Sequence, residues 1–232
     1  MLHDKDIREP LFDFLEETYG KIRIIEEKTM GKSRADVVIV TEDSIIGLEI
    51  KSDADTYARL GRQVKDYDKY YDRNIVVVGT THALHTPEHV PDYWGIITVE
   101  VVDGELDFYF FRKPGINPKL TLKNKLRILW RPELFELQQI FDMPKYKDKS
   151  KDFVISKLAE RVPDKIDPDE LSFHMCRILF ERDYTTIGST LKEYRKGELQ
   201  KAIESETNPQ KRLELMMEQA EKGRSFKRKK HF

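Results

Sequence analysis

The sequence predicts an α/β protein with a mixed sheet in its first half and an all-helical C-terminal extension. Three observations support this class. Short apolar runs typical of strands alternate with helical patterns up to residue 114. A tight-turn signal, Asp103-Gly104, separates the last two runs, and after Pro114 only helical patterns remain.

The first predicted element is a helix from Asp4 to Tyr19. Its apolar residues Ile7, Leu11 and Leu15 recur at helical spacing. Gly20 follows directly, where a helix commonly ends. This helix therefore offers one apolar face to a sheet.

Strand-like runs follow the helix, each short, apolar and rich in β-branched residues. They cover residues 21–27, 35–40, 45–51 and 74–80. Between the third and fourth runs, Leu60, Val64, Tyr67 and Tyr71 form one stripe, which predicts a helix within residues 55–71. Residues 93–113 read as two further strands joined by the Asp103-Gly104 turn. The predicted order of the core is α-β-β-β-α-β.

We expect a core over residues 1–114, a helical extension over 115–222 and a basic, disordered tail over 223–232. Through Pro114 the chain carries 15 Lys and Arg against 23 Asp and Glu, and after it 26 against 19. An acidic half suits a metal site and a basic half attracts a polyanion. Solvated helix faces explain the same charges equally well.

Composition narrows the cellular setting. The 232 residues are 39% hydrophobic and 36% charged, and no apolar run approaches the roughly 18 residues that span a bilayer. We expect no membrane association and no secretory leader. Cys176 is the single cysteine, so no internal disulfide can form. A cytoplasmic protein is the expectation.

Charged residues interrupt two runs that otherwise resemble buried strands. If Thr41–Ser44 is a four-residue hairpin loop, paired residue numbers add to 85 and Asp36 lies opposite Glu49. Alternation puts Lys51 on the same face. Two close carboxylates repel unless a cation lies between them. A surface salt bridge within the hairpin is the structural alternative.

Oxygen ligands without His or Cys suit Mg²⁺ or Mn²⁺, with water and substrate phosphate completing the shell. Such an ion polarises a phosphoryl oxygen and lowers the pKa of a bound water, and a neighbouring lysine orients that water or stabilises the developing charge. The chemistry that fits these residues is phosphodiester hydrolysis.

The run of Asp36 followed by Glu49-Ile50-Lys51 in this element order resembles the PD-(D/E)XK nuclease superfamily, with Ala35 where the motif name has Pro. Gln63 and Tyr67 resemble the QxxxY motif of its RecB-like branch. More narrowly, the chain looks like an uncharacterised family of small bacterial and phage proteins assigned to that superfamily. The resemblance implies a restriction-endonuclease-like core and a Mg²⁺- or Mn²⁺-dependent deoxyribonuclease.

The resemblance also implies roles for individual residues. Asp36 and Glu49 would bind the metal, with the Ile50 carbonyl as a third ligand and a further acid from Glu26, or alternatively Glu9. Lys51 would serve the attacking water. Gln63 and Tyr67 would position the nucleic-acid strand or the metal-site side chains. Arg34 and Arg59 would contact phosphate.

The basic tail suggests nonspecific contact with phosphates, through Lys227, Arg228, Lys229 and Lys230. DNA is the expected partner; RNA and a homodimer are left open. A nucleic-acid-binding or interaction module that kept the fold but lost catalysis is the alternative function. A hydrolase of a small phosphorylated substrate is a third.

Overall fold

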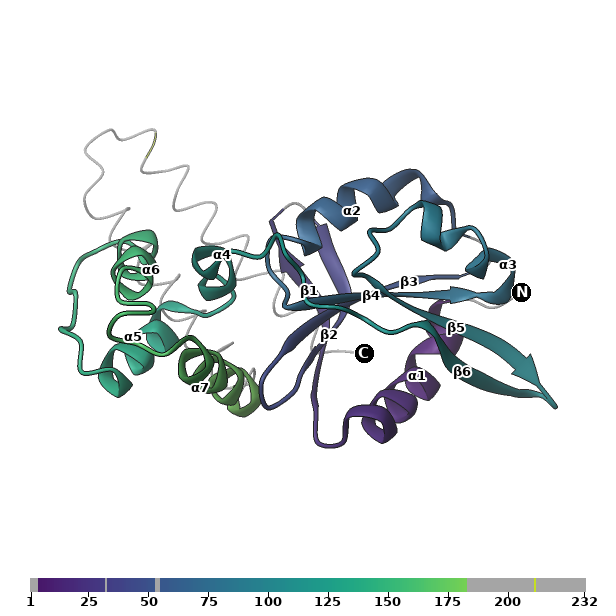
Figure 1. The fold of residues 1–232 in the computed structure, drawn as a ribbon, viewed down its shortest axis with the longest axis horizontal. Helices are drawn as coiled ribbons and strands as arrows, with labels where there is room; N and C mark the ends of the chain where they lie inside the picture. The colour runs from purple at the N-terminus through teal and green to yellow at the C-terminus, as the bar shows by residue number, and fades with distance from the viewer. Residues whose placement is uncertain (1–3, 32, 53–54, 183–210, 212–232) are drawn as a thin grey trace. The chain divides into compact units, whose positions relative to one another are not determined.

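The computed structural model describes residues 4–31, 33–52, 55–182 and 211. The described helices and strands all belong to the first of two units of the chain, Met1–Glu181. The first unit contains a six-stranded sheet and a set of helices (Figure 1). The predicted division at residue 114 stays a prediction, and the predicted tail, residues 223–232, lies outside the described residues.

The strands follow chain order across the sheet. They are β1 (Arg23–Met30), β2 (Ser33–Val40), β3 (Ile45–Lys51), β4 (Arg73–Gly79), β5 (Gly95–Val102) and β6 (Glu105–Arg112). The pairs β3–β4 and β4–β5 are parallel, and the other three pairs are antiparallel. The predicted α/β class with a mixed sheet is confirmed.

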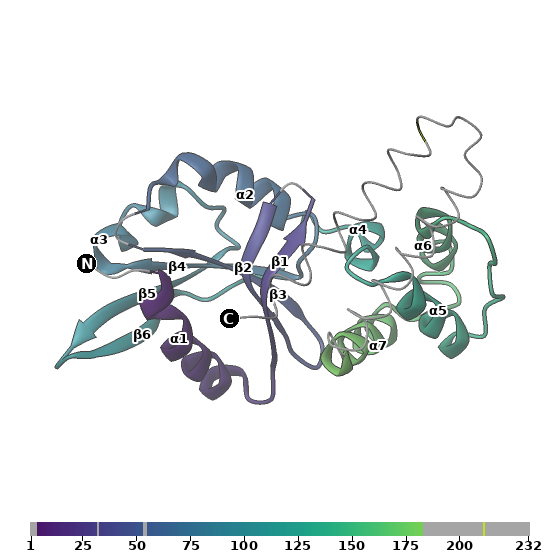
Figure 2. The same cartoon turned by 180° about the vertical axis from the view of Figure 1, so that it is seen from behind.

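Helices cover both faces of the sheet, which explains why β3 is buried along its whole length. α1 (Asp4–Tyr19) lies on one face, and the 3-10 turn η1 (Tyr57–Arg59) leads into α2 (Leu60–Tyr67) on the other (Figures 1 and 2). Ile7, Leu11 and Leu15 of α1 are fully buried. The predicted order α-β-β-β-α-β is therefore confirmed.

Two short helical turns occupy the connection after β4: α3 (Thr80–Ala83) and η2 (Thr86–Glu88). The turn between β5 and β6 is formed as predicted. Asp103 and Gly104 both have positive φ, 52° and 90°, which suits the tight hairpin turns that match strand twist.

The helical extension is confirmed as far as the structure describes it. Its helices are α4 (Leu122–Leu126), α5 (Arg131–Ile140), α6 (Lys151–Ala159) and α7 (Pro168–Glu181). Side-chain oxygens at Thr121 and Ser150 accept from Asn124 N and Phe153 N and so cap α4 and α6. Among the described residues no helix has the length and apolar character that crossing a membrane requires.

A buried ion pair ties this extension to the sheet. Lys125 Nζ in α4 lies 2.7 Å from Asp72 Oδ1, just before β4. The other oxygen of Asp72 accepts from the backbone N of Ile45, at the start of β3. The helices are thereby linked to the strand that carries the Glu-Ile-Lys triplet.

Gly47 in β3 has no room for a side chain. A Cβ there would lie 2.7 Å from Tyr71 Cε2 and 2.9 Å from Tyr67 Cδ1. Gly47→Ala is expected to destabilise the protein by about 1–3 kcal/mol, because both rings are packed in the core and must move. Urea denaturation monitored by tryptophan fluorescence measures the change.

Gly61→Ala is the matched control, since a Cβ on this α2 residue meets nothing within 4 Å. Alanine in a helix should raise stability by about 0.5–1 kcal/mol relative to glycine. A Gly47→Ala variant as stable as the wild type would contradict the packing described here.

Candidate active site

Glu49 is the centre of the candidate site. It lies near the end of β3, only 1% exposed, on the face that α2 covers. Three donors reach its carboxylate: Lys51 Nζ to Oε1 at 2.7 Å, Tyr67 OH to Oε2 at 2.7 Å, and Gln63 Nε2 to Oε1. The buried charge is thus paired and hydrogen-bonded, as a buried charge must be.

Local structure explains why these groups meet. Residues two apart in a strand share a face, so Glu49 and Lys51 lie side by side. Gln63 and Tyr67 are four apart in α2, and this spacing puts both on the helix face that covers β3. Tyr67 OH also lies 3.1 Å from the carbonyl oxygen of Leu48. The structure therefore brings four of the predicted site residues together.

Asp36 joins this group by a contact that differs from the predicted one. The β2–β3 ladder has the predicted register from Val40↔Ile45 to Val37↔Leu48, closed by the four-residue loop. It ends there, one pair before Asp36 would face Glu49. Asp36 Oδ2 instead accepts from Ile50 N at 2.9 Å. The carboxylate replaces a backbone acceptor where the strands separate.

The two carboxylates influence each other electrostatically. Burial, and next the charge of Glu49, raise the pKa of Asp36 from its ordinary 3.8 to about 6, although the Ile50 N–H opposes the shift. Burial and the same two carboxylates raise the pKa of Tyr67 well above its ordinary value. Tyr67 is therefore a neutral hydroxyl that donates to Glu49, and Asp36 is a carboxyl whose ionisation a cation would favour.

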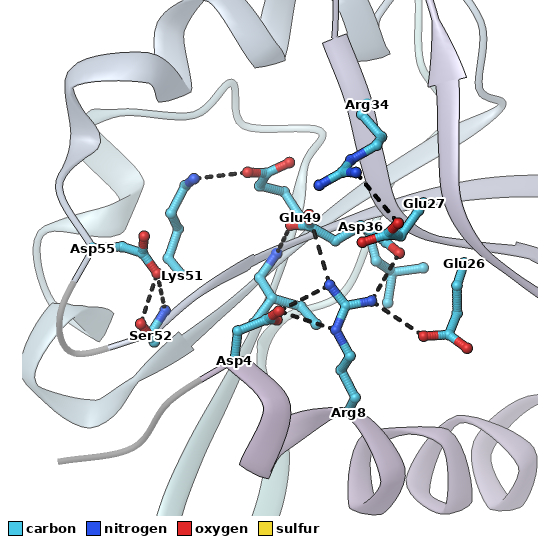
Figure 3. Close-up of polar contacts among 12 residues, drawn as sticks. Asp4, Arg8, Glu26, Glu27, Arg34, Asp36, Glu49, Lys51, Ser52 and Asp55 are labelled. Atoms are coloured by element: carbon cyan, nitrogen blue, oxygen red, sulfur yellow. Dashed lines mark hydrogen bonds and ion pairs between the residues drawn. The ribbon is translucent and has the colours of Figure 1, made fainter. Parts of the chain in front are cut away.

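Arg8 of α1 completes the site and was not predicted from the sequence. Its guanidinium lies 2.9 Å from Asp4 Oδ2, 3.3 Å from Glu26 Oε2 and 3.3 Å from the carbonyl oxygen of Asp36 (Figure 3). It also lies 4.0 Å from Asp36 Oδ1. The Asp4–Arg8 spacing of four on a helix was the available signal. Nothing in the sequence indicated that the pair faces β2.

The remaining predicted residues lie further from Glu49 or bond elsewhere. Glu26 is half exposed, and within the described part of the chain the Arg8 guanidinium is what links it to Asp36 (Figure 3). Arg34 is exposed and pairs with Glu27 at 3.3 Å. Arg59, in η1, is exposed. The predicted phosphate contacts of the tail stay a prediction, because its four basic residues lie outside the described part of the chain: Lys227, Arg228, Lys229 and Lys230.

The donor set suits a hard divalent cation. Asp36 and Glu49 supply carboxylate oxygens, and Gln63 Oε1 is buried with no hydrogen-bond partner. No cluster of three His, Cys, Asp or Glu arranged for a metal occurs in the part of the chain that is described. Two carboxylates with water and substrate oxygens are the environment in which Mg²⁺ is usually bound. The residues present therefore fit such an ion. They would supply fewer protein ligands than a structural calcium site has, and water and substrate would supply the others.

The fold and this site define the class: a mixed α/β protein whose central β2–β3 hairpin holds two close carboxylates and a lysine beneath a Gln-Tyr helix. The sequence gives the family. The model of the bacteriophage P4 protein cII family matches residues 2–186, so the chain belongs to that family.

Other comparisons are distant. A solved structure of SfsA from Pyrococcus furiosus, in complex with Ca²⁺, is 15% identical with a TM-score of 0.31. The alignment covers 50% of this chain and 63% of that chain, so less than two thirds of the SfsA chain is spanned. Similarity at this level carries no conclusion about function. No curated protein matches the sequence.

Proposed function

We propose that this protein is a metal-dependent nuclease that hydrolyses DNA phosphodiester bonds with Mg²⁺ or Mn²⁺. The observation that carries the proposal is the cluster around Glu49, a buried carboxylate that accepts hydrogen bonds from Lys51, Gln63 and Tyr67. The charge of Glu49 also contributes to the raised pKa of Asp36. This is the side-chain set that the resemblance to the PD-(D/E)XK superfamily assigns to catalysis.

Each residue has a role that follows from its contacts. A bound Mg²⁺ or Mn²⁺ would polarise the phosphoryl oxygen and lower the pKa of a bound water. Asp36 and Glu49 would hold the ion, and Ile50 N fixes the Asp36 carboxylate by a hydrogen bond of 2.9 Å. Gln63 and Tyr67 fix the orientation of Glu49. Lys51 would orient the attacking water and stabilise negative charge that develops on the phosphate.

Cleavage of labelled DNA tests the proposal. Linear and covalently closed circular DNA, each single- and double-stranded, is incubated with the full chain and Mg²⁺, Mn²⁺ or EDTA. Cutting is expected with either metal and not with EDTA. Cutting of linear forms alone would identify an exonuclease, and cutting of circles an endonuclease.

A second candidate is a nucleic-acid-binding module without turnover. The observation that favours it is the bonding of Glu49, because both carboxylate oxygens already accept from protein donors. No cleavage with either metal, together with DNA binding that weakens steeply with salt, would support this candidate and contradict the nuclease.

A further inference from the structure

A large groove lies at the end of the β2–β3 hairpin opposite the candidate active site. α1, the β2–β3 loop, β6 and α7 line it, and its volume is about 1360 Å³. Figures 1 and 2 show α7 beside this loop, and Ser172 Oγ lies 3.2 Å from the Asp43 carbonyl oxygen. Five residues of strand, about 16 Å, separate Ser44 from Glu49. The groove is therefore a different place from the site around Glu49.

Aromatic rings form two of its walls. On one side, Phe14 of α1 stacks on Phe108 of β6 with ring centroids 5.6 Å apart, and Phe110 lies 5.7 Å from Phe14. On the other side lie Phe173 and Phe180 of α7. Phe173 is 42% exposed. Exposed rings such as that of Phe173 are the surfaces on which unpaired bases stack.

Basic side chains line the same groove. They are Lys21, Arg73, Lys113 and Arg177, against the acidic Glu42, Asp43 and Glu181. Arg177 is neutralised by Glu136 at 2.9 Å and Glu181 at 3.3 Å. Lys21 Nζ lies 5.1 Å from the centroid of the Phe180 ring, so a cation and an aromatic face are presented together. This pairing suits a phosphate adjoining a stacked base.

The size and lining indicate the class of ligand. The volume exceeds the roughly 300–1,000 Å³ of pockets for small molecules, which favours an extended ligand. Duplex DNA hides the faces of its bases, whereas a single strand offers them to aromatic side chains. We propose that the groove binds several nucleotides of single-stranded DNA. This inference rests on the proposed function in taking nucleic acid as the substrate.

Fluorescence anisotropy of a labelled thymidine 12-mer tests the proposal on the full chain in EDTA, where no metal-dependent cleavage can occur. Phe173→Ala should weaken binding by about 5- to 150-fold, the change that loss of one stacked base produces. Phe111→Ala is the matched control. The Phe111 ring is exposed to solvent to a similar extent, 46%, but it does not line the groove. Its affinity should equal that of the wild type.

Photocrosslinking of a 12-mer that contains 5-iododeoxyuridine identifies where on the protein the single strand binds, and this readout does not depend on the measured affinity. Crosslinked peptides should contain Phe14, Phe110 or Phe173, and an excess of unlabelled duplex should not suppress them. No binding, equal losses in the two variants, or crosslinks confined to Lys227–Lys230 would each overturn the proposal. Because binding is read in EDTA, groove binding without cleavage in metal would overturn the nuclease alone, and cleavage without groove binding would overturn the groove alone.

Discussion

Replacement of Asp36 by asparagine is expected to reduce metal-dependent DNA cleavage by at least about 1,000-fold. A catalytic metal contributes several kcal/mol of transition-state stabilisation, and each 1.4 kcal/mol or so is a factor of ten in rate. The asparagine side chain keeps an oxygen for the Ile50 N–H but loses the charge that would hold the ion. Initial rates of cleavage in Mn²⁺, with Mn²⁺ affinity from isothermal titration calorimetry, measure both effects.

Lys51→Met separates metal binding from chemistry. It should lower cleavage to a similar extent while the protein still binds Mn²⁺, because Lys51 is assigned to the attacking water and not to the ion. Glu27→Gln is the control, since it neutralises an exposed carboxylate of β1 whose ion-pair partner among the described residues is the exposed Arg34. Wild-type rates in Asp36→Asn would refute the assignment of Asp36 as a metal ligand.

The metal-free protein should lose about 3 kcal/mol of stability through Asp36 as pH rises from 3.8 to above 6. The folded pKa of this carboxyl is about 6 against an ordinary 3.8. Below pH 3.8 the Asp36 carboxyl is protonated in both the folded and the unfolded state. Its contribution to the free energy of unfolding is then at its maximum. As pH rises through 6 the folded state must give up the proton that it holds more tightly, and that stability is lost. The difference of about two pKa units corresponds to about 3 kcal/mol.

Asp36→Asn isolates this contribution from that of every other acid. In EDTA the variant should be more stable than the wild type by about 3 kcal/mol at pH 7.5 and equally stable at pH 3.5, from denaturant titrations at a series of pH values. Added Mn²⁺ should stabilise the wild type and leave the variant unchanged. A difference between the two proteins that is constant across this pH range would contradict the origin assigned to the shift.

The parts of the fold that follow from local patterns were predictable. The β3 run at 45–51 has the exact bounds predicted from its apolar residues. The Asp103-Gly104 turn followed from its dipeptide. Gln63 and Tyr67 followed from helical spacing, which fixes which face each residue occupies once the helix is placed. Such features depend on neighbours in the chain, and the sequence contains those neighbours directly.

Two features of the site depend on contacts that no local pattern contains. Glu27 adopts a positive φ of 52°, and β1 and β2 pair on either side of it without a Glu27–Asp36 pair. This distortion accompanies the separation of β2 from β3 at Asp36, whereas ideal alternation predicted direct opposition to Glu49. Arg8 reaches Asp36 from a helix 28 residues earlier. Tertiary packing of α1 against the sheet, not sequence spacing, sets that contact.

The candidate catalytic groups all belong to one uninterrupted stretch of chain, from Asp36 in β2 through β3 to Tyr67 in α2. Only short loops must close to assemble them, so the entropy lost in bringing the groups together is small. The outer strands and the helical extension add stability and surface, but they contribute none of these five groups. Substitutions in the outer strands or in the helical extension would therefore change the surroundings of these groups without removing any of them.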